Sequence, residues 1–315
     1  MTTQPNNILE VALVTGNDRR SMVREALTLL GDAVQKSIAE AHKIFIHPNL
    51  VNYRNQGACT PVEAVRGVLD HISLIRNDII KIGDAGFHDT KKAFDAFGYA
   101  SLDRSGNIEL VDLNDDEAIP VATYDAAVQK SRMHQAASGV LGGMGFSKTI
   151  ADTDCNIVVV PAKMHSYYIA TLAIKTHIVG SLIVKRSPFG IHARWPWLHT
   201  GYKPAHMSLA ELYCEYPARL TVIDGTQAME GDGPASGTTV NLGWVIASLN
   251  PVAADGLAAY LMGWEPEDIG YLYYLEQKNL GPIHVRDMRI LGSDPNMLRR
   301  ELQRPSTYPE ILQWR

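Results

Sequence analysis

Short apolar segments alternate along this chain with segments whose apolar residues recur at helical spacing. The run VALVTG at residues 11–16 is rich in β-branched residues, and residues 18–30 then repeat apolar positions at the spacing of one helix face. The same order returns as KIFIHP before TPVEAVRGVLDHISLIR, and as DIIKIGDAG before KKAFDAFG. A strand that leads into a helix, repeated in this way, is typical of a mostly parallel sheet with helices on its faces. We therefore predict an α/β fold.

Two residues of this first block are predicted to mark helix ends. Thr60 precedes Pro61 and Glu63, and its hydroxyl can cap a helix whose first turn accepts proline and an acidic residue. Gly98 follows KKAFDAF, in the position where glycine adopts the left-handed conformation that closes a helix.

The second block begins with CNIVVVP, a continuous apolar run typical of a strand that is buried on both faces. It continues through YIATLAIKTHIVGSLIV and RLTVIDG to VIASLNPVAADGLAAYLMG, which is predicted to be a strand, a turn and a helix. Residues 112–144 between the blocks are polar and contain glycine, so they are predicted to connect them. We predict two α/β domains, residues 1–130 and 131–315, with mostly parallel sheets and the site in the cleft between them.

Polar residues follow two of the strands predicted in the first block. Asn49 and Arg54 come after KIFIHP, and Asp84 and His88 come after DIIKI. Ligands of parallel sheets bind beyond the carboxyl ends of the strands, and arginine can bind a carboxylate with two hydrogen bonds. We predict that Asn49, Arg54 and Asp84 bind substrate and that His88 is catalytic. Turn formation and helix capping are the alternative roles.

Two Lys-x-His units form the densest group of ionisable residues beside an apolar strand. They place Lys163, His165, Lys175 and His177 within one short stretch. A desolvated lysine can act as nucleophile, base or anchor, and histidine titrates near neutrality. We predict that all four are catalytic; the alternative is lysines that extend to solvent and histidines that are hydrogen bonded within the scaffold.

Three histidines recur every seven residues in GIHARWPWLHTGYKPAH, at His192, His199 and His206. The prolines at 196 and 204 argue against one continuous helix, so the spacing does not place the three on one face. We retain His192 as a candidate metal ligand, and leave open whether the series as a whole is functional.

The segment TVIDGTQAMEGDGPASG leads an apolar strand into a turn rich in glycine and acids. Asp224 and Glu230 are predicted to bind substrate there, by orienting a cationic side chain or holding a cation. The turn lacks the Gly-Lys-Ser/Thr ending of a phosphate-binding P-loop. A purely structural glycine turn is the alternative.

Composition excludes several classes of function. The formal charge is −5 and no long run of Lys or Arg occurs, which disfavours nucleic acid as a partner. No segment approaches the roughly 20 apolar residues of a membrane span, and the first residues do not form a signal peptide, so we expect a cytoplasmic protein. The cysteines at 59, 155 and 214 are far apart and are expected to be free thiols. We expect a homo-oligomer, most simply a homodimer, from general frequencies alone.

The chain resembles the DUF362 family of uncharacterised proteins over nearly its whole length. Two positions depart from the family pattern: His47 stands where a lysine usually precedes Pro-Asn, and Asn250 stands where aspartate is common. Some members carry cysteine-rich ferredoxin-like extensions, which this sequence lacks. The motifs that carry the resemblance are, in order, ALVTGND, HPNLVN, TPVEAVRGVL, IGDAG, FGY, VVVPAKMH, LAIKTHIVG, VIDGTQAMEGDGP and ASLNPVAADGLAAYLMG.

The layout is also similar, more distantly, to the nickel-pincer lactate racemase family. His88 matches the first histidine turn of that family, and His165 precedes Lys175 at the separation found between its second histidine and its cofactor-bearing lysine. His192 falls where the family has a metal-binding histidine, and Arg54 where it has a carboxylate-binding arginine. The resemblance implies a metal ion or a nucleotide cofactor tethered to lysine, although the glycine-rich surroundings of that lysine are replaced here by LAIKTHIVG.

The leading hypothesis is an enzyme that acts on a small oxygenated or carboxylated substrate by acid-base chemistry, of the racemase, epimerase, isomerase or lyase type. His88 and His165 would transfer protons on opposite faces of the substrate, Lys175 would anchor substrate or cofactor, and Lys163 and Arg54 would bind an anion. The cofactor is left open among a metal ion, a lysine-tethered nucleotide and none. The alternatives are a metal- or iron–sulfur-associated redox partner without its own cluster motif, and a non-catalytic binding module with ordinary pKa values.

Overall fold

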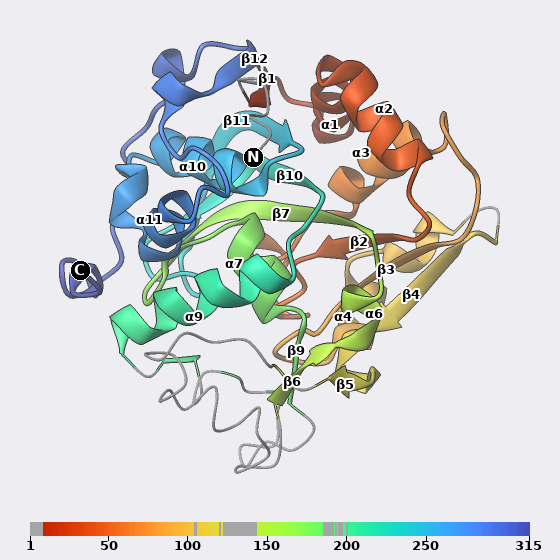
Figure 1. The fold of residues 1–315 in the computed structure, drawn as a ribbon, viewed down its shortest axis with the longest axis horizontal. Helices are drawn as coiled ribbons and strands as arrows, with labels where there is room; N and C mark the ends of the chain where they lie inside the picture. Colours follow the sequence, from red (N-terminus) through yellow and green to blue (C-terminus); the bar gives the residue numbers. More distant parts are fainter. Residues whose placement is uncertain are drawn as a thin grey trace, which may run out of the picture.

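The computed structural model contains one large sheet between two layers of helices (Figure 1). The residues that it describes are 9–103, 106–119, 121, 144–184, 192, 194, 198–199 and 201–315.

Within these residues, nine strands form the large sheet. Along its main path the order is β12 (Arg289–Gly292), β1 (Glu10–Thr15), β11 (Thr238–Ser248), β10 (Leu220–Glu230), β7 (Cys155–His165), β2 (Ile44–Pro48), β3 (Ile80–Asp84) and β4 (Ile108–Asp112). β8 (Ile169–Thr171) pairs with the end of β7. Pairing is parallel from β10 through β7, β2 and β3 to β4 and between β1 and β12, whereas β11 is antiparallel to both of its neighbours. The mostly parallel α/β fold is therefore confirmed.

The two predicted halves of the chain contribute to this same sheet. β7, from the second half, lies between β10 and β2, and β1, from the first half, pairs with β11. A smaller antiparallel sheet contains β5 (Ala118–Ile119), β6 (Met144–Ser147) and β9 (Leu182–Val184). The segment predicted to connect the halves lies partly outside the described residues.

Alternation along the strands divides the core into two layers. On β2, Phe45 packs into one layer while Ile44 and Ile46 pack into the other, because successive side chains of a strand point to opposite faces. One layer is covered by α1 (Arg19–Leu29), α2 (Gly31–Ala39), α3 (Val62–Ile72) and α4 (Thr90–Ala96). The other is covered by α7 (Ala173–Val179), α9 (Tyr202–Glu215), α10 (Pro251–Leu261) and α11 (Gly270–Gln277), with the short α6 (Lys148–Ala151) beside it.

One of the two predicted helix ends is confirmed and the other is wrong. Gly98 adopts the left-handed conformation, with φ of 77°, just after α4. Thr60 does not cap α3, because its hydroxyl accepts the N–H of Asn49 and donates to the carbonyl of Val159. It joins the segment after β2 to the middle of β7 instead, and Pro61 occupies the N-cap of α3 without a side-chain hydrogen bond.

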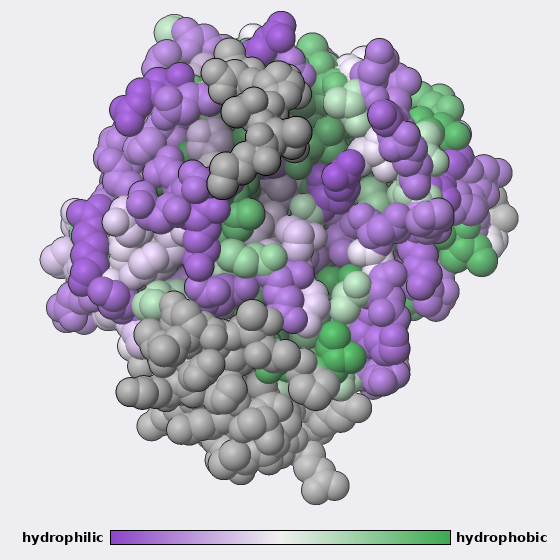
Figure 2. All heavy atoms as spheres, in the orientation of Figure 1, coloured by the Kyte–Doolittle hydropathy of each residue, from purple (hydrophilic) through white to green (hydrophobic). Residues whose placement is uncertain are grey.

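The face of the molecule seen in Figure 2 is covered mostly by hydrophilic side chains, with hydrophobic residues in separated groups. None of the helices in the described part of the chain has the length and apolar character that crossing a bilayer requires. The homo-oligomer remains a prediction.

Candidate functional site

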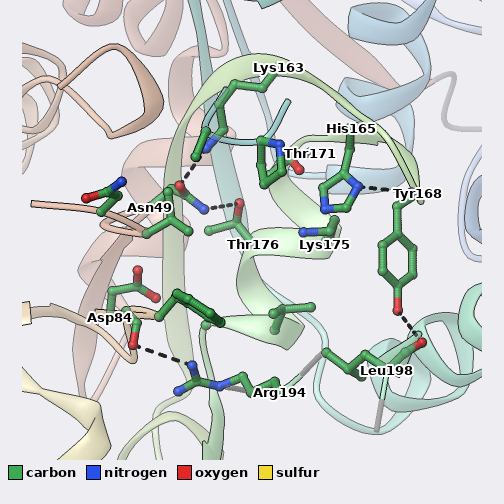
Figure 3. Close-up of a pocket in the computed structure, with 18 of the residues that line it drawn as sticks. Asn49, Asp84, Lys163, His165, Tyr168, Thr171, Lys175, Thr176, Arg194 and Leu198 are labelled. Atoms are coloured by element: carbon green, nitrogen blue, oxygen red, sulfur yellow. Dashed lines mark hydrogen bonds between the residues drawn. The ribbon is translucent and has the colours of Figure 1, made fainter. Parts of the chain in front are cut away.

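A cavity of about 310 Å³ lies beyond the carboxyl ends of the parallel strands β2, β3 and β7 (Figure 3). This is the edge of the sheet at which the sequence places a ligand site. Both halves of the chain contribute to its lining. Six of the predicted site residues line it: Asn49, Asp84, His88, Lys163, His165 and Lys175.

Lys163, near the end of β7, is fully buried and held by two oxygen acceptors. Its Nζ donates to Asn49 Oδ1 at 2.8 Å and to the carbonyl of Ala58 at 2.5 Å. Asn49 is fixed in turn, because its Nδ2 donates to Thr176 Oγ1 at 3.1 Å. Burial lowers the pKa of Lys163 to about 8. An ammonium has three donors, so one N–H of a charged Lys163 remains for a ligand.

Lys175 has a different environment on α7. The Asp255 carboxylate accepts the backbone N–H groups of Ala173 and Ile174 and so holds the first turn of that helix in place. Lys175 Nζ lies 5.3 Å from the centre of the Tyr168 ring, and it makes no hydrogen bond to any residue that the structure describes. Burial, and secondarily the charge of Lys163, lowers the pKa of Lys175 to about 7. A large share of this amine is therefore neutral near neutral pH.

The ring of His165 is restricted to one tautomer. Its Nδ1 accepts the backbone N–H groups of Tyr167 and Tyr168 at 2.9 and 3.2 Å. A ring nitrogen that accepts carries no proton, so the neutral ring has its proton on Nε2. Burial, and then the charge of Lys175, holds the pKa of His165 well below its usual range. In this tautomer the free nitrogen of His165 is a hydrogen-bond donor, and the predicted proton-transfer role stays a prediction.

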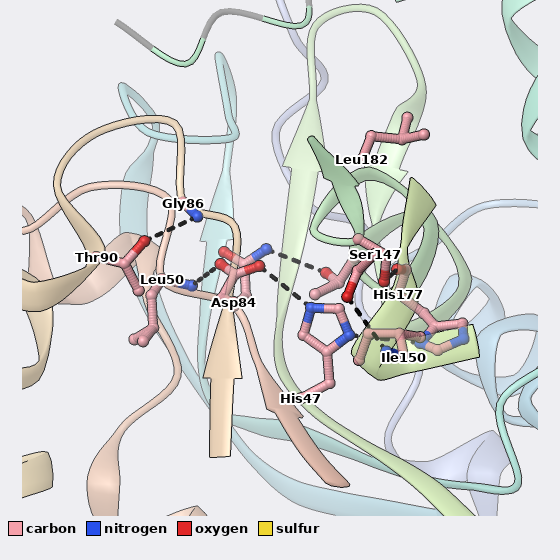
Figure 4. A network of polar contacts seen from close by, with 12 residues as sticks. His47, Leu50, Asp84, Gly86, Thr90, Ser147, Ile150, His177 and Leu182 are labelled. Carbon is pink, nitrogen blue, oxygen red and sulfur yellow. Dashed lines mark hydrogen bonds and ion pairs between the residues drawn. The ribbon is translucent and has the colours of Figure 1, made fainter. Parts of the chain in front are cut away.

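Behind the pocket, Asp84 begins a buried chain of polar contacts (Figure 4). His47 Nε2 lies 3.2 Å from Asp84 Oδ1, His47 Nδ1 lies 3.4 Å from His177 Nδ1, and His177 Nε2 lies 3.0 Å from the carbonyl of Tyr216. The Tyr216 carbonyl can only accept, so His177 carries its proton on Nε2 and its Nδ1 accepts from His47. One further proton must therefore lie between His47 Nε2 and Asp84.

His177 is thus a partner of His47 and not a pocket residue. It has no exposed surface, and its pKa is lowered to about 3 by burial and then by His47. A neutral ring in this place orients His47 and, through it, Asp84. Direct catalysis, as predicted from the Lys-x-His motif, requires contact with a ligand that this position does not allow.

His88 is the half-buried histidine of the lining, with its ring edge-on to Tyr53 at 6.1 Å. Burial and the neighbouring charge of Arg54 lower the pKa of His88, which favours the neutral base. Arg54 itself is exposed, with its guanidinium 5.1 Å from the centre of the Tyr53 ring, and it is not among the lining residues. It therefore acts on the pocket through its charge and not through a contact with the cavity.

The structure gives the two predicted acidic ligands other partners. Asp224 is fully buried on β10, where it pairs with Arg19 Nε at 2.5 Å and accepts from the backbone and hydroxyl of Thr226. Glu230 accepts the backbone N–H of Gln303 at 3.0 Å. Neither lines the cavity, because both point to neighbouring segments of the fold.

Three pocket residues were not assigned to the site from the sequence. Arg194 is buried, and it donates to the carbonyls of Leu182, Gly86 and His192 and to Asn114 Oδ1. Thr171 has a buried hydroxyl without a hydrogen-bond partner among the described residues, and an orphaned hydroxyl in a cavity is suited to a ligand oxygen. His199 also lines the cavity, stacked on Tyr167 at 4.0 Å. In the sequence, only the series of three histidines singled out the segment that contains Arg194 and His199. Long-range packing decides which residues of that segment reach the pocket.

His192 does not take the position of a metal ligand over this pocket. Its Nδ1 lies 3.5 Å from the carbonyl of Val184, and it is not among the lining residues. Nor do three His, Cys, Asp or Glu side chains of the described residues gather as a metal site. Of the two positions that the racemase resemblance implies for a tethered metal cofactor, Lys175 lines the pocket and His192 does not. The described residues therefore do not fit that group, and we derive no step through it.

One of the solved structures that match the chain shares its fold at low sequence identity. The lactate racemase apoprotein from Thermoanaerobacterium thermosaccharolyticum matches with a TM-score of 0.50 and 13% identity. The match covers 83% of this chain and 59% of that one, so the chain spans less than two thirds of its neighbour. A protein from Thermotoga maritima matches with a TM-score of 0.39 and 10% identity, over 84% of this chain and 60% of that one. The first likeness confirms the distant similarity and concerns the fold alone.

No curated protein sequence matches the chain. A family model described as "Domain of unknown function (DUF362)" matches residues 44–260, which is more than half of the chain. The matched stretch contains β2, β3, β7 and α7, the elements that carry the pocket. The chain therefore belongs to the DUF362 family.

Proposed function

We propose that the protein is an enzyme that binds a small carboxylate in this pocket and moves a proton at a nearby carbon of that substrate. The observation that carries the proposal is the excess of cationic groups in the lining. Lys163, Lys175 and Arg194 converge there, and Asp84 is the one carboxylate among the lining residues of the described chain. Such a field favours an anionic ligand.

The proposed roles follow from the contacts of each side chain. Lys163 has an N–H left for a carboxylate oxygen, while Arg194 contributes mainly fixed charge, since four hydrogen bonds to the protein occupy its guanidinium. His165 Nε2–H donates to a substrate oxygen. His88 is the accessible base that removes and returns the proton, and Lys175 anchors the substrate.

The lowered pKa values support an enzyme over a binding module. A module needs only shape and charge, whereas this pocket contains two lysines and three histidines whose pKa values all lie below their usual range. The redox-partner alternative gains no support from the described cysteines, because Cys59, Cys155 and Cys214 are free and dispersed.

Proton exchange at carbon provides the test. The protein is incubated in deuterated water with lactate, the substrate named for the structural neighbour, and with a panel of small 2-hydroxy, 2-amino and 2-oxo acids. We expect deuterium to replace a hydrogen of at least one acid, on the carbon beside the carboxylate or, in a 2-oxo acid, on the carbon beside the carbonyl, and His88→Asn to abolish the exchange without loss of folding. Full exchange in His88→Asn would contradict the assignment of the base, and no exchange and no binding for the whole panel would contradict the substrate class.

A further inference from the structure

We propose that Lys175 captures its substrate covalently, as an imine with a carbonyl carbon, and that the substrate class is therefore small oxo acids. This inference rests on the proposed function, because it assumes a carboxylate in the same pocket. It goes further by naming the reactive group of the substrate and the atom of the protein that it meets.

The two pocket lysines differ in how their amines are bound. Lys163 Nζ is occupied by Asn49 and by the carbonyl of Ala58. Lys175 Nζ lines the same cavity but has no hydrogen-bond acceptor among the described residues. A lone pair that is free and directed into a cavity is what attack on a carbonyl carbon requires.

The surroundings of Lys175 favour the neutral amine. The residue is 7% exposed, and Lys163 supplies a second positive charge nearby. Desolvation and a neighbouring cation are the two effects that activate imine-forming lysines. The Tyr168 ring at 5.3 Å acts in the opposite direction, because a cation within about 6 Å of a ring centre is attracted to it.

The pocket also contains hydrogen-bond donors that can bind the oxygen of the substrate carbonyl. The buried hydroxyl of Thr171 has no partner among the described residues, and His165 presents its Nε2–H. Both line the cavity with Lys175, and Figure 3 shows the His165 ring beside the Lys175 amine. These donors suit the hydroxyl of a carbinolamine, the first product of attack.

The reaction balances without an oxidant or reductant. The Lys175 nitrogen forms a bond to the carbonyl carbon, and the carbonyl oxygen takes up a proton. The nitrogen loses one of its two protons to solvent. The hydroxyl oxygen takes up a second proton from solvent and leaves as water, and the product is a protonated imine. Its positive charge acidifies the C–H on the carbon attached to the imine carbon, which is C3 in pyruvate, and His88 can remove that proton. Hydrolysis reverses the sequence.

Reductive trapping tests the proposal on the chain of 315 residues. The protein is incubated with pyruvate or glyoxylate and cyanoborohydride, and its intact mass and proteolytic peptides are measured. We expect one reduced adduct, on Lys175, in the wild type and in Lys36→Arg, a matched variant of a surface lysine that is 73% exposed. Lys175→Arg retains a long basic side chain but has no nucleophilic amine, so it should form no adduct. The peptide map of the wild type locates the adduct even if that variant fails to fold.

Other outcomes separate this inference from the proposed function. Binding of oxalate, measured by calorimetry, tests the carboxylate pocket independently of any covalent step. Oxalate binding without an adduct would overturn the imine and leave the pocket intact. An adduct spread over surface lysines, or a modification of Lys175 already present in protein purified from its own host, would also overturn the imine. An adduct on Lys175 without oxalate binding would support the imine and contradict the carboxylate site.

Discussion

Two neighbouring strands of the sheet bury charge in opposite ways. On β10, Asp224 has Arg19 and Thr226 as partners, so its charge is satisfied within the protein. On the adjoining strand β7 and on α7, Lys163 and Lys175 are buried with no carboxylate bound directly to either amine among the described residues. Burying an unpaired charge costs free energy. A cavity lined by two buried lysines without carboxylate partners is therefore suited to an anionic ligand. The ion pair between Asp224 and Arg19 is instead a structural contact.

The sharpest contrast is expected from His88→Asn. Removing the base should lower the exchange rate by roughly 100- to 10,000-fold, the usual contribution of general acid-base catalysis. The melting temperature should change little, because His88 is only half-buried and its side chain makes ring contacts, with Tyr53 and Phe87, within the described part of the chain. Deuterium exchange and thermal unfolding of the same preparation measure both effects. If His88→Asn lost stability as well as activity, His88 would be a structural residue like Asp224, and the contrast between the pocket and the ion pair on β10 would be contradicted.

Asp224→Ala should produce the reverse pattern. Losing one member of a buried ion pair is expected to cost about 3 kcal/mol of unfolding free energy, at the lower end of the usual range because the Arg19 side chain is 20% exposed. Denaturant unfolding measures this loss. Oxalate affinity of the folded fraction should equal that of the wild type, and a selective loss of affinity would instead include Asp224 in the site.

Lys163→Met should weaken oxalate binding and leave the stability of the fold nearly unchanged. A hydrogen bond to a charged group contributes about 1.5–3 kcal/mol, which corresponds to roughly 10- to 100-fold in oxalate affinity. Stability should stay close to that of the wild type, since removal of a buried charge offsets the loss of two hydrogen bonds. Calorimetry and unfolding of this variant beside Lys36→Met, the surface control, provide the comparison. Unchanged affinity would contradict the anion-binding role.

The smallest effect is a pH dependence of stability. The folded pKa of Lys175, about 7, lies below that of an exposed lysine, so the unfolded chain binds more protons above pH 7. Stability contributed by this group therefore rises with pH, and Lys163, at about 8, acts in the same direction. Between about pH 7 and pH 9 the wild type should gain more stability than Lys175→Met. Parallel curves for the two proteins would show that Lys175 is not desolvated as described.

Much of the fold and part of the pocket could be predicted from the sequence because their causes are local. Apolar periodicity predicted the strand and helix alternation, and Gly98 the helix end that is observed. Because ligands of parallel sheets bind beyond the carboxyl ends of the strands, the sequence indicated Asn49, Asp84 and His88, and all three line the cavity. A motif within one strand and the helix that follows brought Lys163, His165 and Lys175 to the same edge.

Only the tertiary structure decided the rest, because the order of strands depends on contacts between distant segments. The sequence alone specified α/β alternation and a concentration of lysine and histidine, but not that β7 lies between β2 and β10. That order brings His47 beside His177 and Asp84. Asp224 is paired with Arg19 for the same reason, 205 residues away along the chain. Local patterns specify which elements form, whereas long-range packing determines which buried charges find partners and which are left for a ligand.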